Sequence, residues 1–320
     1  MAGTAPTPAA PADTVFRFFN KEQGKNYAQY RLNYHSRLYQ TIVDRHTSTG
    51  GQLTTLLDVG CGPGTAVRTL APLFEHAIGI DPSHGMINTA LSMTDAGDAT
   101  KLEPIRFEIS QAEELGSNLS PPIADGSVDL ITAATSAHHF DMAGFWTRAA
   151  QVLKPGGTVA LWCSGSLTVD PSMPNFACMQ VALDSHEELL KDHTGAGSLL
   201  TRNLYRDLPL PWTLATPVPE FDETTSFRKE WGTGGDSEPG NEFFSHQPPA
   251  DMDTLEKMLG TTGSVARWRK ANPDAVGTER DVARIIRRRV EKCFREAGVE
   301  AGKELLKGGV AGVLLIVKKK

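Results

Sequence analysis

The chain has 320 residues, of which 40% are hydrophobic and 22% charged, and its 32 Lys and Arg against 38 Asp and Glu give a formal net charge of −6. This composition excludes wholesale disorder, and the acidic balance argues against a nucleic-acid binder that works by neutralising phosphates. The longest run without strongly polar residues, 308–317, is too short for a membrane helix, so we expect no membrane insertion.

The cysteines and the N-terminal sequence indicate the cellular compartment to expect. The four cysteines lie far apart and form no CxxC pair; they are Cys61, Cys163, Cys178 and Cys293. Their spacing predicts neither a disulfide framework nor a zinc site, favours a reducing compartment, and leads us to expect no bound metal. The N-terminus has no basic region followed by an apolar stretch, so we expect no secretory signal and a cytoplasmic location.

In chain order, residues 1–14 are rich in Pro and Ala and are predicted to be disordered, and residues 15–46 are predicted to be helical. Short apolar runs then alternate with segments of helical periodicity. The predicted strands are 53–59, 76–80, 105–109, 128–134 and 158–163. The predicted helices are 65–74, 83–93 and 145–153. Strands that alternate with helices in this way predict an α/β fold with a parallel sheet.

The pattern changes after residue 164. Residues 165–280 are rich in Pro and aromatic residues and predict a cap that folds over the sheet, with one strand at 225–231 that returns to it. Residues 281–297 predict a strongly amphipathic helix, and 310–317 predict a final strand. We therefore expect a core made of residues 15–164 and 281–320, and a substrate cap made of residues 165–280.

The strongest motif is LLDVGCGPGTAVRTL at residues 56–70, in which a buried strand leads into a turn with Gly60, Gly62 and Gly64. Glycines at alternate positions let the backbone approach a ligand closely and adopt a positive φ. Asp81 ends the next predicted strand, so in a doubly wound sheet it lies beside this turn and can accept two ribose hydroxyls. Asp58 would repel a pyrophosphate but could hold a cationic amino group, directly or through water. The expected ligand is therefore a nucleoside with a zwitterionic tail.

These motifs resemble those of class I S-adenosylmethionine-dependent methyltransferases and follow that family's order over residues 50–165. The matching segments are LLDVGCGPGTAV, IGIDPSHGMI, FEISQAEEL, SVDLITAATSAHHF and VLKPGGTVALW. The resemblance implies S-adenosylmethionine as cofactor and a doubly wound, Rossmann-like sheet of seven mostly parallel strands with a final antiparallel pair. It also implies a set of cofactor-binding residues: Asp58, Gly60, Cys61, Gly62, Gly64, Asp81, Pro82, Met86, Gln111, Ala112 and Ala134, with Tyr27 and Arg31 from the N-terminal helix.

A closer resemblance is to the trans-aconitate methyltransferase subgroup, which methylates carboxylates of small acids. It rests on TAATSAHHFDMAGFW, NYAQYRLNYHSRLY and TLEKMLGTTGSVARWRKANPD. Two positions depart from that subgroup. Arg31-Leu32 stands where Arg-Pro is usual, and residues 260–263 read Gly-Thr-Thr-Gly where the subgroup tends to have Arg-Thr-Trp-Ser. The second departure lies in the expected substrate lid, so it bears on the acceptor rather than on the cofactor.

The acceptor determines which side chains the chemistry needs. A carboxylate is already ionised at pH 7 and needs a cation to hold it, whereas a hydroxyl or amine needs a base. His138 and His139 follow the fourth predicted strand at its carboxyl end, where ligands bind in open α/β sheets, and are the expected catalytic residues. The candidate cations are Arg202, Arg206, Arg228, Arg267 and Arg269. The expected substrate-binding residues are Tyr30, Tyr34, Arg228, Trp231 and Trp268.

The first functional expectation is methyl transfer to an oxygen of a small organic acid, which gives a methyl ester. One alternative is O- or N-methylation of a specialised metabolite with a histidine as base. Another is a non-catalytic methyltransferase-like regulator that binds the cofactor. The expected partner is a small-molecule acceptor, without nucleic acid, and the chain is expected to be a monomer or a homodimer.

Overall fold

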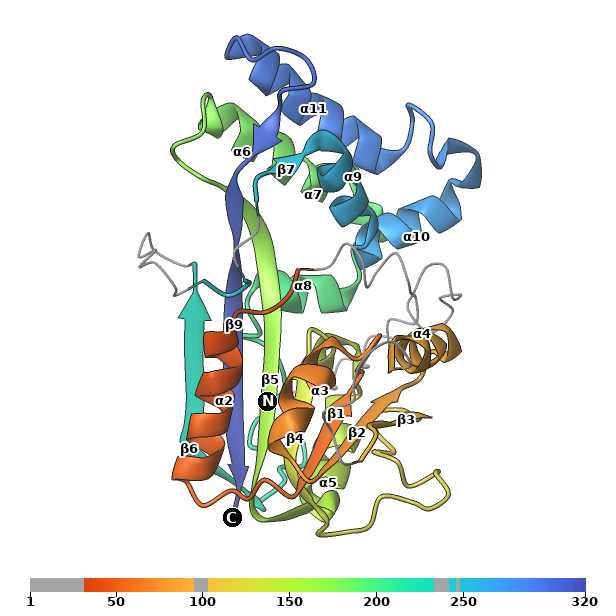
Figure 1. Cartoon of the computed structure of the whole chain (residues 1–320), viewed down its shortest axis with the longest axis vertical. Helices are drawn as coiled ribbons and strands as arrows, with labels where there is room; N and C mark the ends of the chain where they lie inside the picture. Colours follow the sequence, from red (N-terminus) through yellow and green to blue (C-terminus); the bar gives the residue numbers. More distant parts are fainter. Residues whose placement is uncertain (1–31, 95–102, 233–241, 246–247) are drawn as a thin grey trace, which may run out of the picture.

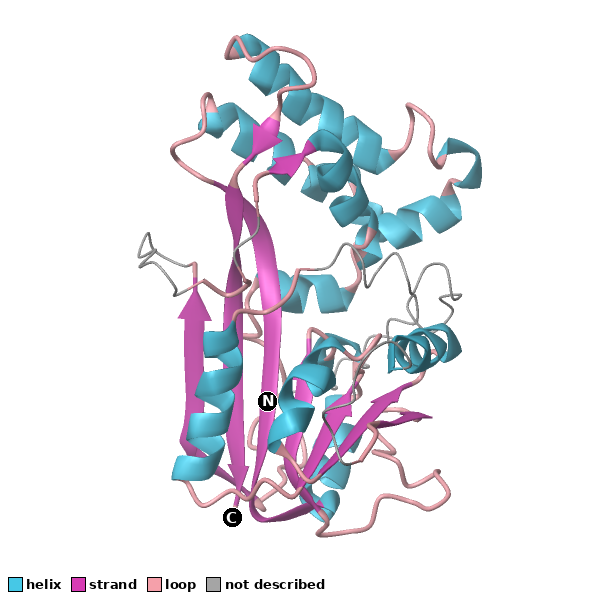
Figure 2. Cartoon of the chain, viewed as in Figure 1, coloured by secondary structure: helices cyan, strands magenta, loops and turns pink. Residues whose placement is uncertain are grey.

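A seven-stranded sheet forms the lower part of the molecule in Figures 1 and 2. This computed structural model describes residues 32–94, 103–232, 242–245 and 248–320. The strand order is β3-β2-β1-β4-β5-β9-β6. Strands β1 to β5 pair in parallel, and β9 runs antiparallel between β5 and β6. This is the α/β, doubly wound, mostly parallel sheet that was expected, including its final antiparallel pair.

The predicted strands all occur; most ends shift by a few residues, but the strand predicted at 158–163 extends over 153–169. Their bounds are β1 (Thr55–Val59), β2 (His76–Asp81), β3 (Arg106–Ile109), β4 (Val128–Ala134), β5 (Leu153–Val169), β6 (Phe221–Trp231) and β9 (Gly308–Lys319). The helices that alternate with them are α3 (Thr65–Leu70), α4 (His84–Thr94) and α5 (Met142–Val152). Pro72 lies in the 3-10 turn Ala71–Leu73 that follows α3, because proline cannot continue the α-helical hydrogen bonding. The helix predicted at 65–74 is therefore shorter than expected.

Apolar side chains cover both faces of the sheet. Along β5, Val159 and Leu161 belong to the cluster on the α5 side, whereas Ala160 and Trp162 belong to the cluster on the other side. This alternation is what a strand buried on both faces requires. The second cluster is closed by α2 (Ser36–Ser48), which lies along β9 and β6 in Figure 1. The predicted helix at 15–46 overlaps α2 only at its end, and residues 15–31 of it lie outside the described residues.

Strands β5 and β9 continue beyond the sheet as a paired ribbon, in which Val169 pairs with Gly308. A cap sits at the end of this ribbon, and α8 lies between the cap and the sheet (Figure 1). The bounds are α6 (Phe176–Asp184), α7 (His186–Leu189), α8 (Ala196–Arg202), α9 (Met252–Gly260), α10 (Gly263–Ala271), α11 (Val282–Glu296), β7 (Ala250–Asp251) and β8 (Leu305–Leu306). A third apolar cluster joins α6, α9, α10 and α11, so the cap has a core of its own, whereas Leu200 of α8 packs against the cluster on the α5 side of the sheet.

The division of the chain differs from the expected one in two places. Helix α11 was expected in the core, but its buried residues Val282, Ile286 and Val290 belong to the cap cluster. The amphipathic pattern shows that one face is buried, but it does not identify the surface that covers it. Conversely, residues 221–231 were expected in the cap and instead form β6, the edge strand of the sheet; the return of residues 225–231 to the sheet was predicted.

The cysteine expectation is wrong for one pair. Cys178 of α6 and Cys293 of α11 form a disulfide, although they are 115 residues apart. Their spacing could not reveal it, because the two helices meet only through the packing of the cap. Cys61 and Cys163 are free and buried. Cysteine usage therefore no longer argues for a reducing compartment.

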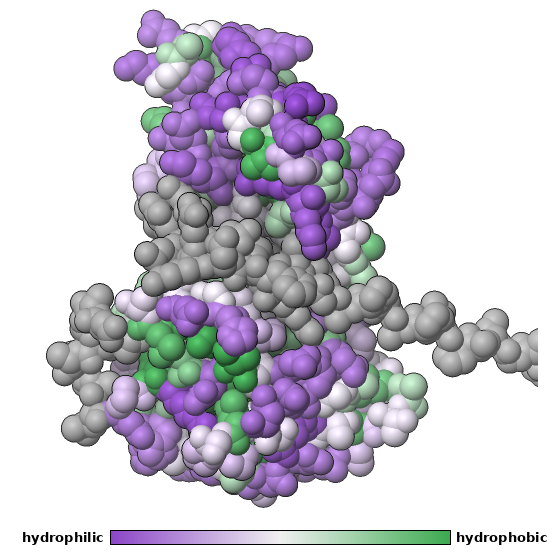
Figure 3. Space-filling model, turned by 90° about the vertical axis from the view of Figure 1, so that its right-hand side faces the viewer, coloured by the Kyte–Doolittle hydropathy of each residue, from purple (hydrophilic) through white to green (hydrophobic). Residues whose placement is uncertain are grey.

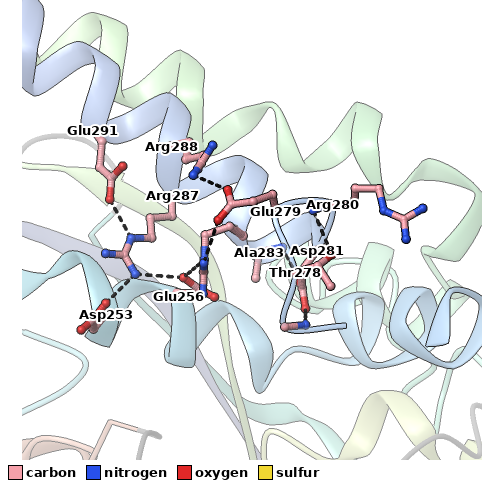
Figure 4. A network of polar contacts seen from close by, with 12 residues as sticks. Asp253, Glu256, Thr278, Glu279, Arg280, Asp281, Ala283, Arg287, Arg288 and Glu291 are labelled. Atoms are coloured by element: carbon pink, nitrogen blue, oxygen red, sulfur yellow. Dashed lines mark hydrogen bonds and ion pairs between the residues drawn. The ribbon is translucent and has the colours of Figure 1, made fainter. Parts of the chain in front are cut away.

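Ion pairs join the polar side of α11 to α9 (Figure 4). Arg287 contacts Asp253 (2.5 Å) and Glu256 (3.0 Å) of α9, and Glu291 of its own helix (2.7 Å). The face of the cap that Figure 3 shows is largely hydrophilic. None of the helices within the described ranges has the length and apolar character needed to cross a membrane.

Candidate functional site

The turn after β1 has the backbone conformation that glycine permits. The φ angles of Gly60, Gly62 and Gly64 are 64°, 54° and 91°, in the left-handed region. A Cβ at Gly60 would lie 2.6 Å from the Cβ of Ser136, whereas a Cβ at Gly62 would meet no atom of the described residues within 4 Å. The turn is therefore closely packed at Gly60 and open at Gly62.

Asp81 lies beside this turn, as its position at the end of β2 predicted. Its carboxylate accepts hydrogen bonds from the backbone N–H groups of Gly62 (3.0 Å) and Ser83 (2.8 Å). Each carboxylate oxygen can accept more than one hydrogen bond. The turn thus holds a fixed carboxylate next to the open side of Gly62, where it can also accept hydroxyl groups of a ligand.

Asp58 is fully buried beneath the turn. Its Oδ1 accepts a hydrogen bond from the Thr132 hydroxyl (2.6 Å), while Oδ2 is buried and makes no hydrogen bond of normal geometry within the described part of the chain. Burial raises the pKa of this carboxyl to about 7, and the nearby Asp81 adds to the rise, although Thr132 and the Val67 amide act in the opposite direction. A buried carboxyl with an unused oxygen is suited to a cationic ligand group.

One cavity of about 300 Å³ joins this turn to the cap. Its volume is at the lower end of the range for small-molecule sites. It lies at the carboxyl ends of the parallel strands, as expected for an open α/β sheet. The expected cofactor-binding residues that line it are Gly60, Cys61, Gly62, Asp81, Pro82, Met86, Ala112 and Ala134.

The remaining expected cofactor-binding residues do not line the cavity. Asp58 lies below its floor, and Gln111 is exposed outside it. At Gly64 a Cβ would lie 2.9 Å from the ring of Phe107, so this glycine is explained by packing of the turn. Tyr27 and Arg31, together with the substrate candidate Tyr30, lie outside the described residues.

The two expected catalytic histidines line the cavity side by side. His138 and His139 form the end of a 3-10 helix, Ala137–His139, that follows β4. Their ring centroids are 4.0 Å apart. Nδ1 of His138 lies 2.9 Å from the Tyr205 hydroxyl, a contact that the sequence did not indicate.

Tyr34 is the substrate candidate that the structure places at the cavity. Its ring stacks on Phe244 with centroids 5.2 Å apart, and its hydroxyl lies 2.8 Å from the Thr135 hydroxyl. Thr135 follows β4 with a φ of 52°, which is unusual for a β-branched residue. Such backbone conformations persist where the surroundings enforce them, and they cluster at functional sites.

The other substrate candidates lie away from the cavity. The Arg228 guanidinium donates to the Leu204 carbonyl (2.5 Å) and pairs with Glu230 (2.6 Å). Trp231 is buried in the second apolar cluster, against Phe243. Trp268 packs against the cap cluster. These three side chains therefore do not line the cavity; they pack or hydrogen-bond within the structure around it.

The cap supplies cavity-lining residues that were not singled out as substrate-binding. Arg202 was one of the five candidate cations. Among the described residues that line the cavity it is the single arginine, and there is no lysine. Its Nη2 lies 3.5 Å from Nε2 of His186, which also lines the cavity. Hydroxyl groups come from Ser198, Thr201 and Ser264, and aliphatic side chains from Leu167, Leu183, Leu190, Leu259, Val265 and Ile286. Sequence periodicity could not identify them, because five separate stretches of the chain after residue 164 converge here.

Comparison with known proteins agrees with this geometry. Residues 57–161 match a family described as a methyltransferase domain. The chain is 31% identical over 146 residues to a Saccharomyces cerevisiae protein named "Probable S-adenosylmethionine-dependent methyltransferase CRG1", covering 45% of this chain and 47% of that protein. It is 32% identical over 155 residues to Methyltransferase cfoB of Aspergillus candidus, covering 48% and 46%. The chain thus spans about half the length of these curated relatives.

A solved structure shares the fold. It is a candidate type II methyltransferase from Anaeromyxobacter dehalogenans, with a TM-score of 0.55 and 21% sequence identity. The alignment covers 90% of this chain and 97% of that one. At this identity the likeness supports the architecture of the sheet and leaves the acceptor to be argued from the cavity.

Proposed function

We propose that this chain, whose residues 57–161 match a methyltransferase-domain family, uses S-adenosylmethionine to methylate an oxygen of a small organic molecule. The supporting observation is that the glycine turn and the cap line a single cavity. Methyl transfer from a sulfonium is an in-line displacement, so donor and acceptor must be aligned and water excluded. A cavity with the glycine turn at one end and the cap at the other serves both purposes.

The residues at the glycine turn fit S-adenosylmethionine, which when bound supplies an electrophilic methyl group on a sulfonium. The open side of Gly62 leaves room for the ligand next to the backbone. Oδ2 of Asp58 is buried behind the turn and outside the cavity lining, so its negative charge would attract a cationic amino group through the turn, whereas Asp81 lines the cavity and offers acceptors for the ribose hydroxyls. The buried side chains of Met86 and Ala112 provide an apolar wall for a base.

Asp58 makes donor binding depend on pH. In the ligand-free fold its pKa is raised to about 7, against about 4 when unfolded, so the folded state holds an extra proton between these values. The free energy of unfolding should therefore fall as pH rises from 4 to 7 and then level off. A cationic amino group favours the ionised carboxylate, so donor affinity should rise up to about tenfold per pH unit below 7 and level off above it.

Titration calorimetry at pH 5.5 to 8.5, in buffers of different ionisation enthalpy, measures both the affinity and the protons released. Asp58→Asn is isosteric and cannot ionise, so it should remove the pH dependence and weaken binding at pH 8 by about 1–3 kcal/mol. A pH-independent affinity in the parent protein would contradict the assignment of Asp58.

The cap end of the cavity favours an acceptor with an apolar body. Six aliphatic side chains line it, and within the described ranges the lining has one arginine and no lysine. A small tricarboxylate would require several cations, because unpaired carboxylates are costly to desolvate. An acceptor with one reactive oxygen on an aliphatic or aromatic framework suits this lining better. This argument favours a specialised metabolite over a trans-aconitate-like acid.

The two histidines suit a hydroxyl acceptor. As the acceptor oxygen bonds to the methyl group, its proton passes to His138 and the electron pair of the carbon–sulfur bond stays on sulfur. A carboxylate acceptor is the second candidate. Arg202, beside His186, could then hold the ion in the cavity without any need for a base.

Calorimetry with S-adenosylmethionine and S-adenosylhomocysteine, followed by a mass-spectrometric product screen, tests the proposal. The screen should contain apolar phenols and alcohols, apolar monocarboxylic acids, and trans-aconitate. We expect turnover of hydroxyl acceptors, and His138→Gln should lower that turnover about 100-fold or more while preserving donor binding. Methyl esters as the main products would favour the second candidate. Binding without turnover of any acceptor would favour a non-catalytic regulator, and absence of binding would contradict the whole assignment.

A further inference from the structure

A buried tyrosine, Tyr205, contacts the ring of His138 but lies outside the sequence motif that contains the histidine. Tyr205 is 1% exposed, and its hydroxyl lies 2.9 Å from Nδ1 of His138. The ring centroids of the two residues are 6.1 Å apart. Because Nδ1 is engaged by Tyr205, any proton that His138 exchanges with an acceptor has to pass through Nε2.

The backbone around Tyr205 is arranged to direct the side chain inward. Leu204 and Tyr205 have φ angles of 49° and 56°, two consecutive non-glycine residues in the left-handed region. Hydrogen bonds from their N–H groups to the Thr201 and Leu200 carbonyls (3.0 and 2.9 Å) hold this conformation at the end of α8. Arg228 donates to the Leu204 carbonyl from β6. Arg228, which was expected to bind substrate, thus stabilises the turn that contains Tyr205.

Two further groups surround this contact. Burial is the main cause that raises the pKa of both Tyr205 and the Cys163 thiol; a smaller hydrogen-bond contribution between the two groups raises the pKa of Tyr205 and lowers that of Cys163. The Tyr205 hydroxyl therefore has a second polar neighbour toward which its own proton can point. On the other side, a Cβ at Gly197 of α8 would lie 2.8 Å from the His138 carbonyl oxygen and 3.0 Å from Cδ2. His138 is thus enclosed between α8 and Tyr205.

We propose that Tyr205 is a positioning residue that accepts the Nδ1 proton of His138, so that the Nε2 lone pair receives the proton of the acceptor. In this arrangement the Tyr205 proton points toward Cys163. The opposite arrangement, in which Tyr205 donates to Nδ1, would place a proton on Nε2 and make His138 a donor that cannot act as a base. The proposal rests on the proposed hydroxyl methylation, since a carboxylate acceptor needs no base.

The first test does not require turnover. In the ¹⁵N-labelled full-length protein with bound S-adenosylhomocysteine, the ¹⁵N shifts of His138, assigned with the aid of His138→Gln, report which ring nitrogen carries the proton. We expect a single tautomer protonated on Nδ1, and a mixture of tautomers in Tyr205→Phe. A parent protein protonated on Nε2 would overturn the proposal even if hydroxyl methylation is established.

The second test separates positioning from packing. Tyr205→Phe keeps the ring and removes one hydroxyl, so we expect kcat to fall at least 10-fold while the acceptor KM and the Kd for S-adenosylhomocysteine change less than threefold. Tyr39→Phe is the matched control, since Tyr39 is also a buried tyrosine but belongs to the apolar cluster on the other side of the sheet. It should leave all three values unchanged. Unchanged kcat in Tyr205→Phe would overturn the proposal.

Gly197→Ala reaches His138 from the opposite side and serves as a second variant if Tyr205→Phe does not fold. Its added methyl group must displace His138 or α8. We expect the same pattern, a fall in kcat with nearly unchanged donor-product binding. A fall in donor-product binding as large as the fall in kcat would contradict a positioning role for this contact.

Discussion

Gly62→Ala is expected to weaken donor binding at least 100-fold, which corresponds to about 2.8 kcal/mol, while leaving the ligand-free fold almost intact. No atom of the described residues lies within 4 Å of the added Cβ, and Gly62 lines the cavity. The methyl group would therefore occupy space that the donor needs. The fold should lose only the cost of a side chain at a φ of 54°, about 1 kcal/mol.

Gly126→Ala is the matched control for this prediction. Gly126 has a φ of 61°, and a Cβ there also meets no described atom within 4 Å, but it lies in a turn before β4 and outside the cavity lining. Calorimetry with S-adenosylhomocysteine and denaturant unfolding should give both variants a similar loss of stability but only Gly62→Ala a loss of binding. Equal donor affinity in the two variants would show that the donor does not approach this turn.

Reduction of the Cys178–Cys293 disulfide is expected to lower the free energy of unfolding by about 4 kcal/mol. The bond closes a loop of 115 residues, and a cross-link of this length restricts the unfolded chain strongly. It also joins α6 and α11, whose residues Leu183 and Ile286 line the cap end of the cavity. Denaturant unfolding with and without a reductant measures the change.

The double variant Cys178→Ser, Cys293→Ser distinguishes this effect from any other action of the reductant. It should match the reduced parent protein and show no further response to reductant, because Cys61 and Cys163 are already free. A thiol assay under denaturing conditions should find two reactive cysteines in the parent protein before reduction. Four reactive cysteines would mean that the bond does not form.

The glycine turn shows how far local chemistry could be predicted. The motif at residues 56–70 identified the turn, and the alternation of strands with helices identified the sheet that carries Asp81 to it. Both predictions rest on short-range constraints: positive φ at glycines and side-chain periods of 2 and 3.6 residues. In a doubly wound sheet these constraints also determine that the ends of β1 and β2 meet. The glycine turn and the place of Asp81 beside it therefore followed from the sequence, whereas Asp58, Gly64 and Gln111 of the expected set do not line the cavity.

The acceptor side did not follow in the same way. Arg228 and Arg202 are both arginines of the region after β5, yet one braces a turn and the other lines the cavity. Tyr205 has no motif around it, and its contact with His138 depends on a left-handed turn at the end of α8. Such contacts join segments that are tens of residues apart, so no local pattern encodes them.

The sequence by itself thus determined the sheet, the glycine turn, the two carboxylates and the position of the histidines, because each depends on backbone rules that act over a few residues. Only the tertiary structure decided which cap residues face the cavity, that α11 belongs to the cap, and that Cys178 meets Cys293. These features depend on which of several apolar surfaces each amphipathic helix packs against. The packing of the whole chain determines this, rather than any one segment.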